Sequence, residues 1–155
     1  MERSLIAPIR EALADKLVLL SGPRQCGKTT LAQMVDSDYD YVNYDNVEHR
    51  VILREQSWDR QRKLLILDEL HKMKEWKRWL KGIYDVSHFH HSFLVTGSAR
   101  LDVYRRGGDS LLGRYHYWRL HPFTLDERPV GMEPVEAYRR LMTVGGFPEP
   151  FLDGD

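Results

Sequence analysis

Two glycines, a lysine and a threonine lie at a spacing that suits the binding of a phosphate group. Gly22 and Gly27 enclose four residues, and Lys28 and Thr29 follow directly, which gives the pattern G-x-x-x-x-G-K-[ST]. Glycines allow backbone angles and close approaches that a Cβ atom would block. In such a loop the backbone N–H groups surround an anion, the lysine brings a positive charge to the terminal phosphates, and the threonine hydroxyl can ligate Mg²⁺. The alternative is a glycine-rich turn that contains a lysine by chance.

The residues on both sides of this loop favour the phosphate-binding interpretation. The apolar run 17–20 precedes the loop and predicts a strand that is buried on both faces of a sheet. Residues 31–35 follow with a helical pattern, so we expect a helix from Lys28 to about Asp36. Strand, loop and helix in this order are the context in which the pattern binds phosphate. The residues expected to bind nucleotide here are Gly22, Pro23, Arg24, Gln25, Cys26, Gly27, Lys28, Thr29 and Thr30.

Two adjacent carboxylates end a second apolar run. Residues 64–67 are Leu-Leu-Ile-Leu, and Asp68 and Glu69 follow them. In phosphate-loop NTPases an aspartate at a strand end supports the Mg²⁺ shell, so Thr29 and Asp68 are the predicted metal ligands. Glu69 stands where a carboxylate could orient and deprotonate a water that attacks the γ-phosphate. By itself this stretch is better explained as a buried strand followed by helix-capping acids, and only its pairing with the loop favours the catalytic interpretation.

A third apolar run ends in polar residues. Residues 92–96 predict a buried strand that ends in Thr96-Gly97-Ser98. A polar side chain at this end would lie in the cleft between the loop and the two carboxylates, where it could contact the γ-phosphate or the attacking water. The alternative is a turn residue, and the context favours the cleft.

Two further residues near the expected cleft have open interpretations. Asp45 follows the predicted strand 39–44 and opens a helix to about Glu55, so it could cap that helix or line the cleft, and the prevalence of Asp at caps favours capping. Cys26 lies beside a helix N-terminus, whose positive dipole end favours a thiolate. We therefore expect thiol reagents to label Cys26 in the nucleotide-free protein.

The remaining pattern predicts four more elements. An amphipathic helix is expected over residues 4–15 with Ser4 as its cap, and a second over residues 75–86. Residues 115–120 alternate in the manner of a strand. A last helix is expected over residues 134–143, before Gly145-Gly146.

Composition narrows the functional classes. The chain has 155 residues, with 23 basic and 23 acidic side chains, so bulk attraction to nucleic acid or to an anionic membrane is not indicated. One cysteine excludes an internal disulfide framework and fits a reducing cytosol. No apolar stretch approaches the length of a membrane span. We therefore expect a cytoplasmic protein without a membrane partner.

Together the motifs resemble those of the prokaryotic AAA+-type P-loop ATPases, ATP-binding proteins that carry a C-terminal domain of unknown function. The resemblance implies an α/β fold of three layers, with a parallel sheet of order 5-1-4-3-2 flanked by helices, and it implies ATP and Mg²⁺ as ligands. The segments that carry it are 22–30, 67–70, 95–98, 112–114 and 145–149.

The resemblance also assigns residues outside the loop. Ser98 would be the polar sensor of the fourth strand, Arg114 matches a Gly-Arg motif, and Pro148 lies in a segment thought to lie against the nucleotide. In the expected sheet order Arg114 faces away from the phosphates of its own subunit and could act on a neighbouring copy. It could equally be a surface arginine paired with a carboxylate such as Asp109. His71 departs from the Gln that is common in the family.

The resemblance implies that residues 1–128 form an ATPase core and that residues 129–155 begin a helical lid or following subdomain, truncated here. The favoured function is a Mg²⁺-dependent AAA+ ATPase that couples nucleotide binding and hydrolysis to a conformational change, with self-association or a protein partner. A nucleotide-dependent switch or scaffold with little hydrolysis, and a DNA-processing ATPase, are the alternatives. The expected catalytic residues are Lys28, Glu69, Ser98 and Arg114, and the arginines available to DNA are Arg100, Arg105, Arg106 and Arg114.

Overall fold

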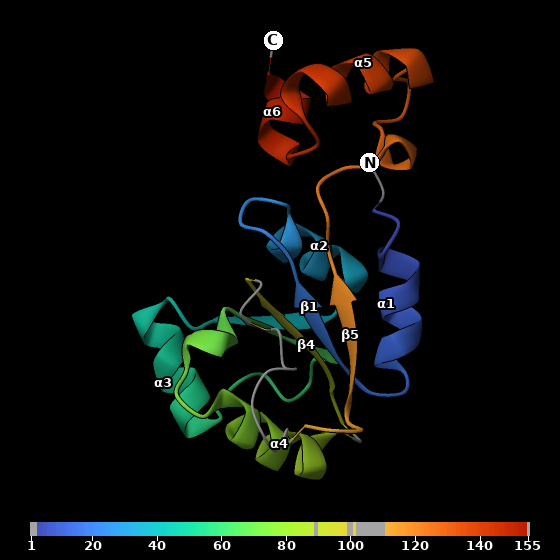
Figure 1. The fold of residues 1–155 in the computed structure, drawn as a ribbon. Coiled ribbons are helices and arrows are strands. Elements are labelled where there is room, and N and C mark those ends of the chain that lie inside the picture. Colours follow the sequence, from blue (N-terminus) through green and yellow to red (C-terminus); the bar gives the residue numbers. More distant parts are fainter. Residues whose placement is uncertain (1–2, 89, 99–100, 102–110, 155) are drawn as a thin grey trace.

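The computed structural model describes residues 3–88, 90–98, 101 and 111–154. Its centre is a parallel sheet in the order β2-β3-β4-β1-β5, flanked by helices (Figure 1). This is the predicted order 5-1-4-3-2 read from the other edge, so the predicted topology is confirmed. The strands are β1 (Leu17–Ser21), β2 (Tyr39–Asn43), β3 (Leu64–Asp68), β4 (Ser92–Gly97) and β5 (Tyr115–Arg119).

Within the described residues there are six α-helices and two 3₁₀ turns: one α-helix precedes the first strand, and the other elements connect strands or follow the last one. The α-helices are α1 (Ile6–Leu13), α2 (Lys28–Val35), α3 (Val47–Glu55), α4 (Trp76–Ser87), α5 (Pro134–Val144) and α6 (Pro148–Asp153). The 3₁₀ turns are η1 (Leu70–Lys72) and η4 (Leu125–Glu127). Among the described residues, no helix has both the length and the apolar character that crossing a bilayer requires.

The two faces of the sheet carry separate hydrophobic cores, which explains why its inner strands are apolar throughout. On one face Leu19, Leu65 and Val95 pack with side chains of α3 and α4. On the other face Leu20 and Leu94 pack with side chains of α1 and α2. Side chains alternate between the faces along a strand, so a strand that is covered on both faces carries apolar side chains on both. The predicted three-layer arrangement is thereby confirmed.

The register of the sheet brings the polar strand ends together. Ser21 of β1 pairs with Gly97 of β4, and Asp68 of β3 pairs with Thr96 of β4. All five strands run parallel, so the loop after β1 and the residues after β3 and β4 meet at one edge. Ligands of open parallel sheets bind at this carboxyl edge.

Both expected helix caps differ in the structure. Leu5, rather than Ser4, occupies the N-cap position of α1. The Ser4 hydroxyl instead donates to Glu127, because the chain beyond β5 returns to this point. Asn46, rather than Asp45, caps α3, and its side-chain oxygen accepts from the backbone N–H groups of Glu48 and His49. Asp45 is therefore not the cap of α3, and it lines the cavity beside the loop instead.

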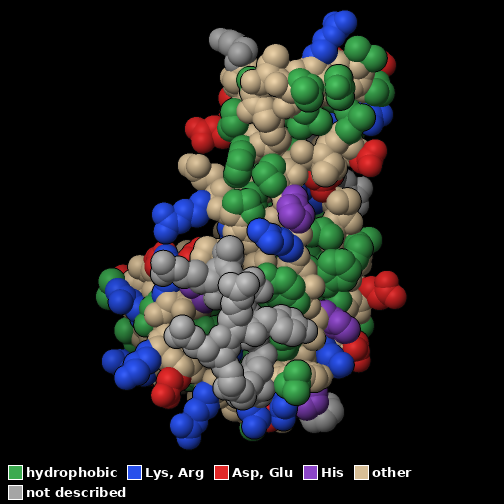
Figure 2. All heavy atoms as spheres, in the orientation of Figure 1, with side chains coloured by type: hydrophobic (Ala, Val, Ile, Leu, Met, Phe, Trp, Pro, Cys, Tyr) green, Lys and Arg blue, Asp and Glu red, His purple; other side chains and the backbone are tan. Residues whose placement is uncertain are grey.

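The C-terminal helices have a small core of their own beyond the carboxyl edge of the sheet (Figure 1). Phe123 packs with Ala137 and Phe151. The sequence predicted α5 but not α6, which begins with Pro148 at a first-turn position where proline is tolerated. Figure 2 shows hydrophobic side chains gathered over this part of the molecule. The exposed apolar residues of α5 include Val135, Tyr138 and Met142.

Candidate functional site

The loop between β1 and α2 needs glycine at two positions for different reasons. Gly27 has φ 87°, in the left-handed region that side chains disfavour. Gly22 is required by a close approach, since an added Cβ would lie 2.5 Å from the carbonyl oxygen of Leu120. Gln25 also has a left-handed backbone, with φ 60°. The loop therefore curls tightly between the strand end and the N-terminus of α2, as an anion cradle does.

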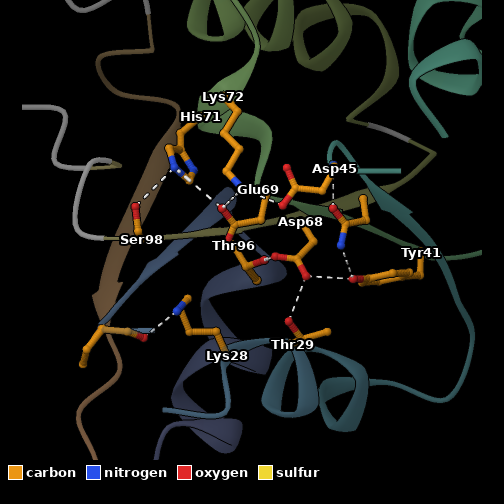
Figure 3. Close-up of polar contacts among 12 residues, drawn as sticks. Lys28, Thr29, Tyr41, Asp45, Asp68, Glu69, His71, Lys72, Thr96 and Ser98 are labelled. Atoms are coloured by element: carbon orange, nitrogen blue, oxygen red, sulfur yellow. Dashed lines mark hydrogen bonds and ion pairs between the residues drawn. The ribbon is translucent and has the colours of Figure 1, made fainter. Parts of the chain in front are cut away.

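The lysine and threonine of the loop are held in place by polar contacts (Figure 3). Lys28 is only 7% exposed, and its Nζ donates to the carbonyl oxygen of Pro23 over 2.6 Å. The ammonium group thus folds back over the loop that precedes it. Thr29 Oγ1 donates to Asp68 Oδ2 over 2.8 Å, which joins the first turn of α2 to the end of β3.

Asp68 is the most completely hydrogen-bonded group of the site. It is 4% exposed and accepts from three hydroxyls: Thr29 and Tyr41 donate to Oδ2, and Thr96 donates to Oδ1. The Tyr41 bond measures 2.7 Å, and the side-chain amide of Asn43 donates to the same phenol oxygen over 3.1 Å. Burial, and then the hydrogen bond to Asp68, raise the pKa of Tyr41. These bonds fix the orientation of the carboxylate.

Thr96 has a different role from the one expected at the end of its strand. Its side chain is fully buried and donates to Asp68, so it supports this carboxylate from below rather than facing the open cleft. The register explains this, because Thr96 lies directly beside Asp68 in the sheet. Ser98, two residues on, lines the cavity, and its hydroxyl lies 3.2 Å from His71 Nε2.

Glu69 follows Asp68 in a left-handed conformation, with φ 56°. Its backbone N–H donates to the carbonyl oxygen of Thr96 over 3.0 Å. Its side chain is 23% exposed. The carboxylate Oε2 lies 3.2 Å from Lys72 Nζ and 3.7 Å from His71 Nε2. Lys72 Nζ also lies 2.5 Å from Asp45 Oδ2. The carboxylate predicted to activate water is therefore in an ion pair, and Asp45, which follows the neighbouring strand β2, shares the same cation.

Two adjoining cavities, of about 630 and 740 Å³, receive most of the predicted site residues. Arg24, Glu69 and Lys72 line both cavities. A hollow of about 620 Å³ lies along α4 and is lined by none of the predicted site residues. The first cavity is also lined by Gln25, Gly27, Lys28, Thr29, Thr30, Asp45, Pro148 and Glu149, and the second by Gly22, Pro23, His71 and Ser98.

The sequence of residues 14–128 matches the AAA domain family. The chain belongs to this family. Family and fold together assign a nucleotide-binding P-loop domain of AAA+ type. Proteins of Mycobacterium bovis and Mycobacterium tuberculosis, both described only as uncharacterised, are each 30% identical over 154 residues. The match covers 96% of this chain and 34% of each relative, so the chain spans about a third of the length of these relatives.

Solved structures support the fold of the AAA domain. A signal transduction ATPase with numerous domains and a tetratricopeptide repeat sensor, from Pyrococcus horikoshii, is 16% identical with a TM-score of 0.62. The similarity covers 97% of this chain and 29% of that one. The Aeropyrum pernix ORC1 protein, solved in complex with DNA, is 15% identical with a TM-score of 0.54, over 88% of this chain and 53% of the other. At these identities the likeness concerns the fold alone.

Cys26 of the AAA domain is not the reactive thiol that its sequence position suggested. The side chain is fully buried and packs in the apolar cluster shared by β1, α1 and α2. Burial raises the pKa of the Cys26 thiol, and this effect outweighs the nearby charges of Lys28 and Arg3. The expectation of a thiolate is wrong because the side chain turns inward, and Cys26 lines neither of the two cavities.

Arg114 lies at the other end of the sheet from the loop. Its carbonyl oxygen accepts from the N–H of Leu17, at the start of β1, whereas the loop follows the end of β1. Its guanidinium forms a two-pronged ion pair with Asp85 of α4, at 2.6 and 3.1 Å. Asp109, the partner named from sequence, lies outside the described residues, as do Arg100, Arg105 and Arg106. The pairing with Asp85 leaves a role in a neighbouring copy as a prediction.

Arg3 is a buried residue that sequence reasoning missed. Its Nη1 donates to the carbonyl oxygen of Cys26 over 3.2 Å, and its Nη2 donates to the carbonyl oxygen of His121 over 2.6 Å. Its Nε donates to Glu127 over 3.1 Å, and the guanidinium lies 4.6 Å from the ring centroid of Phe123. Burial would raise the pKa of Glu127, but the bonds from Ser4 and the charge of Arg3 lower it overall. One side chain thus links the loop to the C-terminal segment.

Proposed function

We propose that this chain is the core of a Mg²⁺-dependent AAA+ ATPase, which binds ATP at the loop and hydrolyses it. The main support for this proposal is the hydrogen bond of 2.8 Å between Thr29 and Asp68. It brings together the two oxygen ligands that the sequence analysis assigned to one metal ion. Hydroxyl and carboxylate oxygens are the ligands Mg²⁺ takes in nucleotide sites. When bound, the ion would neutralise charge on the phosphates.

The loop fits a phosphate chain. The space beside Gly27 is open, since the atom nearest to a Cβ added there would be Pro148 Cγ at 3.8 Å. The backbone N–H groups at the start of α2 would bind the phosphates, with the ammonium group of Lys28 beside them. Pro148 lines the same cavity, which supports its proposed place against the nucleotide.

Glu69 is the proposed base, and Ser98 the proposed polar group beside the attacking water. Glu69 lines both cavities, on the side facing the loop. A positioned carboxylate takes the proton of the attacking water as the bond to phosphorus forms. The ion pair between Glu69 and Lys72 also favours the second candidate, a nucleotide-dependent switch with little hydrolysis, because a paired carboxylate is less available to water.

Coupling to a conformational change is proposed through the C-terminal segment. Pro148 and Glu149 of α6 line the cavity, and Arg3 bonds to both the loop and the segment that leads to α5. Residues 129–155 would then begin a lid or subdomain beside a core of residues 1–128. The proposal includes association with a second copy or a protein partner and a cytoplasmic location, and a DNA-processing ATPase is its alternative.

The test is equilibrium binding of a fluorescent ATP analogue, with Mg²⁺ and without it. Lys28→Ala should abolish binding, because it removes the cation of the cradle. Lys74→Ala is the matched control, since this lysine is exposed and lines neither cavity of the site. Equal binding by Lys28→Ala and the parent protein, or no binding by the parent protein, would contradict the proposal.

A further inference from the structure

Lys72 lies between two carboxylates that follow neighbouring strands of the sheet (Figure 3). Its Nζ is 2.5 Å from Asp45 Oδ2, in the connection between β2 and α3, and 3.2 Å from Glu69 Oε2, at the end of β3. The hydrogen bond to Asp45, and then that to Glu69, outweigh burial and raise the pKa of Lys72. The side chain therefore stays an ammonium ion, and it joins the residues that follow β2 and β3, which are neighbouring strands of the sheet.

The position of Lys72 is suited to a ligand that is more negative than the carboxylates it now binds. Lys72 lines both cavities of the site together with the loop. Its side chain is 37% exposed, so it can turn without disturbing a packed core. Two other cations line these cavities: Lys28, which is only 7% exposed and is bonded within the loop, and Arg24 of the loop.

The charges around the cavities favour a cation between the carboxylates of Asp45 and Glu69. Asp45, Glu69 and Glu149 line the first cavity, and Asp68 lies beneath it. A terminal phosphate brought toward Asp45 and Glu69 would be repelled by both unless a positive charge lay between them. A diphosphate, which is one phosphate shorter, would not extend as far toward this pair.

We propose that Lys72 is the residue through which this site distinguishes a nucleoside triphosphate from a diphosphate. On binding of the triphosphate, the ammonium group keeps its closer bond to Asp45 and exchanges Glu69 for the terminal phosphate. Phosphate oxygens form strong, charge-assisted hydrogen bonds with an ammonium group. The exchange frees Glu69 to accept a proton from water, so the presence of the terminal phosphate and the availability of the base are linked. The proposal rests on the proposed function and adds a specificity residue to it.

The test compares the affinities of Mg-ATP and Mg-ADP by calorimetry in the parent protein and in Lys72→Met. We expect Lys72→Met to bind ATP about 10- to 100-fold more weakly, as for the loss of a hydrogen bond between charged groups, and ADP within about threefold of the parent protein. Lys72→Arg should restore most of the ATP affinity, because it retains the charge. Lys74→Ala, on the neighbouring exposed lysine, should leave both affinities unchanged.

A triple variant separates attraction by Lys72 from repulsion by the two carboxylates it leaves behind. If Lys72 contacts the terminal phosphate, Lys72→Met combined with Asp45→Asn and Glu69→Gln should still have a reduced ratio of ATP to ADP affinity. Recovery of the parent ratio in the triple variant would overturn the proposal, since the loss would then come from unpaired Asp45 and Glu69. Equal weakening of both nucleotides would also overturn it, because Lys72 would then only hold Asp45 and Glu69 in place.

Failure of this inference is distinguishable from failure of the proposed function. If the parent protein binds neither nucleotide, the ATPase assignment is wrong and the inference falls with it. If the parent protein binds ATP and Lys72→Met binds both nucleotides with parent affinities, only the inference is wrong. Unchanged thermal unfolding midpoints across the variants establish that the comparison is made between folded proteins.

Discussion

The Thr29 hydroxyl donates to the Asp68 carboxylate over 2.8 Å, although 39 positions separate the two residues in the chain. The parallel order of the sheet makes this contact possible. β4 lies between β1 and β3, so the loop after β1 passes over the end of β4 to reach Asp68. Thr96, at that end of β4, supports the same carboxylate from beneath. Side chains from α2, β2 and β4 therefore meet at one buried carboxylate at the end of β3.

Glu69→Gln should retain ATP binding and lose hydrolysis. The amide keeps the size of the side chain but cannot take a proton from water, and general-base catalysis typically contributes about 100-fold or more to the rate. Phosphate release and ATP affinity are measured on the same preparation. Hydrolysis by Glu69→Gln at the parent rate would remove Glu69 from the role of base. A parent protein that binds ATP but releases no phosphate would favour the switch.

Tyr41→Phe should lower the free energy of unfolding by about 1 to 2 kcal/mol, because it removes one hydrogen bond to the buried carboxylate of Asp68. The change also leaves the side-chain amide of Asn43 without this acceptor. Urea unfolding monitored by circular dichroism gives the measurement. Tyr39→Phe is the control on the same strand, since its hydroxyl is not one of the three that bond to Asp68. Equal loss in both variants would show that the bond to Asp68 adds nothing.

The sequence was sufficient for the parts of the site that are contiguous in the chain. The loop 22–30 and the pair Asp68-Glu69 each carry their chemistry in one short pattern, and apolar runs next to them identify the strands that place them. The three-layer fold follows from the same runs, because a strand that is apolar on both faces must be covered on both. The sheet order came from the resemblance to a family and is confirmed.

The contacts between distant segments could not be predicted from the sequence. Tyr41 reaches Asp68 because of the register between β2 and β3, and Asp45 reaches Lys72 because Asn46 takes the capping position. Neither arrangement has a short-range signal. Arg3 is likewise an ordinary charged residue near the N-terminus until the chain beyond β5 returns to bury it. Cys26 was misjudged because the direction of its side chain depends on packing against the sheet, which the loop pattern does not specify.

Acid should destabilise the protein through Glu127. The pKa of Glu127 is lowered in the folded protein from its ordinary value of 4.5, so its contribution to stability is present above about pH 4.5 and is lost as the pH falls through the folded value. Glu127→Gln should cost roughly 3 kcal/mol at neutral pH, because it leaves Arg3 buried without its anion. The difference between the variant and the parent protein should shrink toward zero in acid.

Urea unfolding at a series of pH values tests this prediction. Asp126→Asn is the matched control, since Asp126 is the exposed neighbour of Glu127 in η4. The control should follow the parent curve at every pH. A difference between Glu127→Gln and the parent protein that stays constant down to the lowest pH would mean that the charge of Glu127 does not contribute to stability.

Arg114 should act, if it is catalytic, on the nucleotide of a neighbouring copy. Its place beside the start of β1 is at the far end of the sheet from the loop, so it cannot serve its own subunit. To serve another subunit it must leave Asp85, with which it is paired on an exposed surface where ion pairs contribute little stability. A guanidinium supplied to the transferring phosphate can raise the rate about a thousandfold or more where it operates.

A mixing experiment decides between this role and a merely structural pair. In a preparation shown to associate, Arg114→Ala should bind ATP normally and hydrolyse it poorly. Adding Lys28→Ala protein, which is inactive but has Arg114 intact, should restore hydrolysis at the sites of the Arg114→Ala subunits. Asp85→Asn is the control, because it breaks the same ion pair while leaving the guanidinium free. If Arg114→Ala and Asp85→Asn have the same modest effect, and no mixing ratio restores activity, Arg114 is a structural partner of Asp85 and not part of the catalytic site.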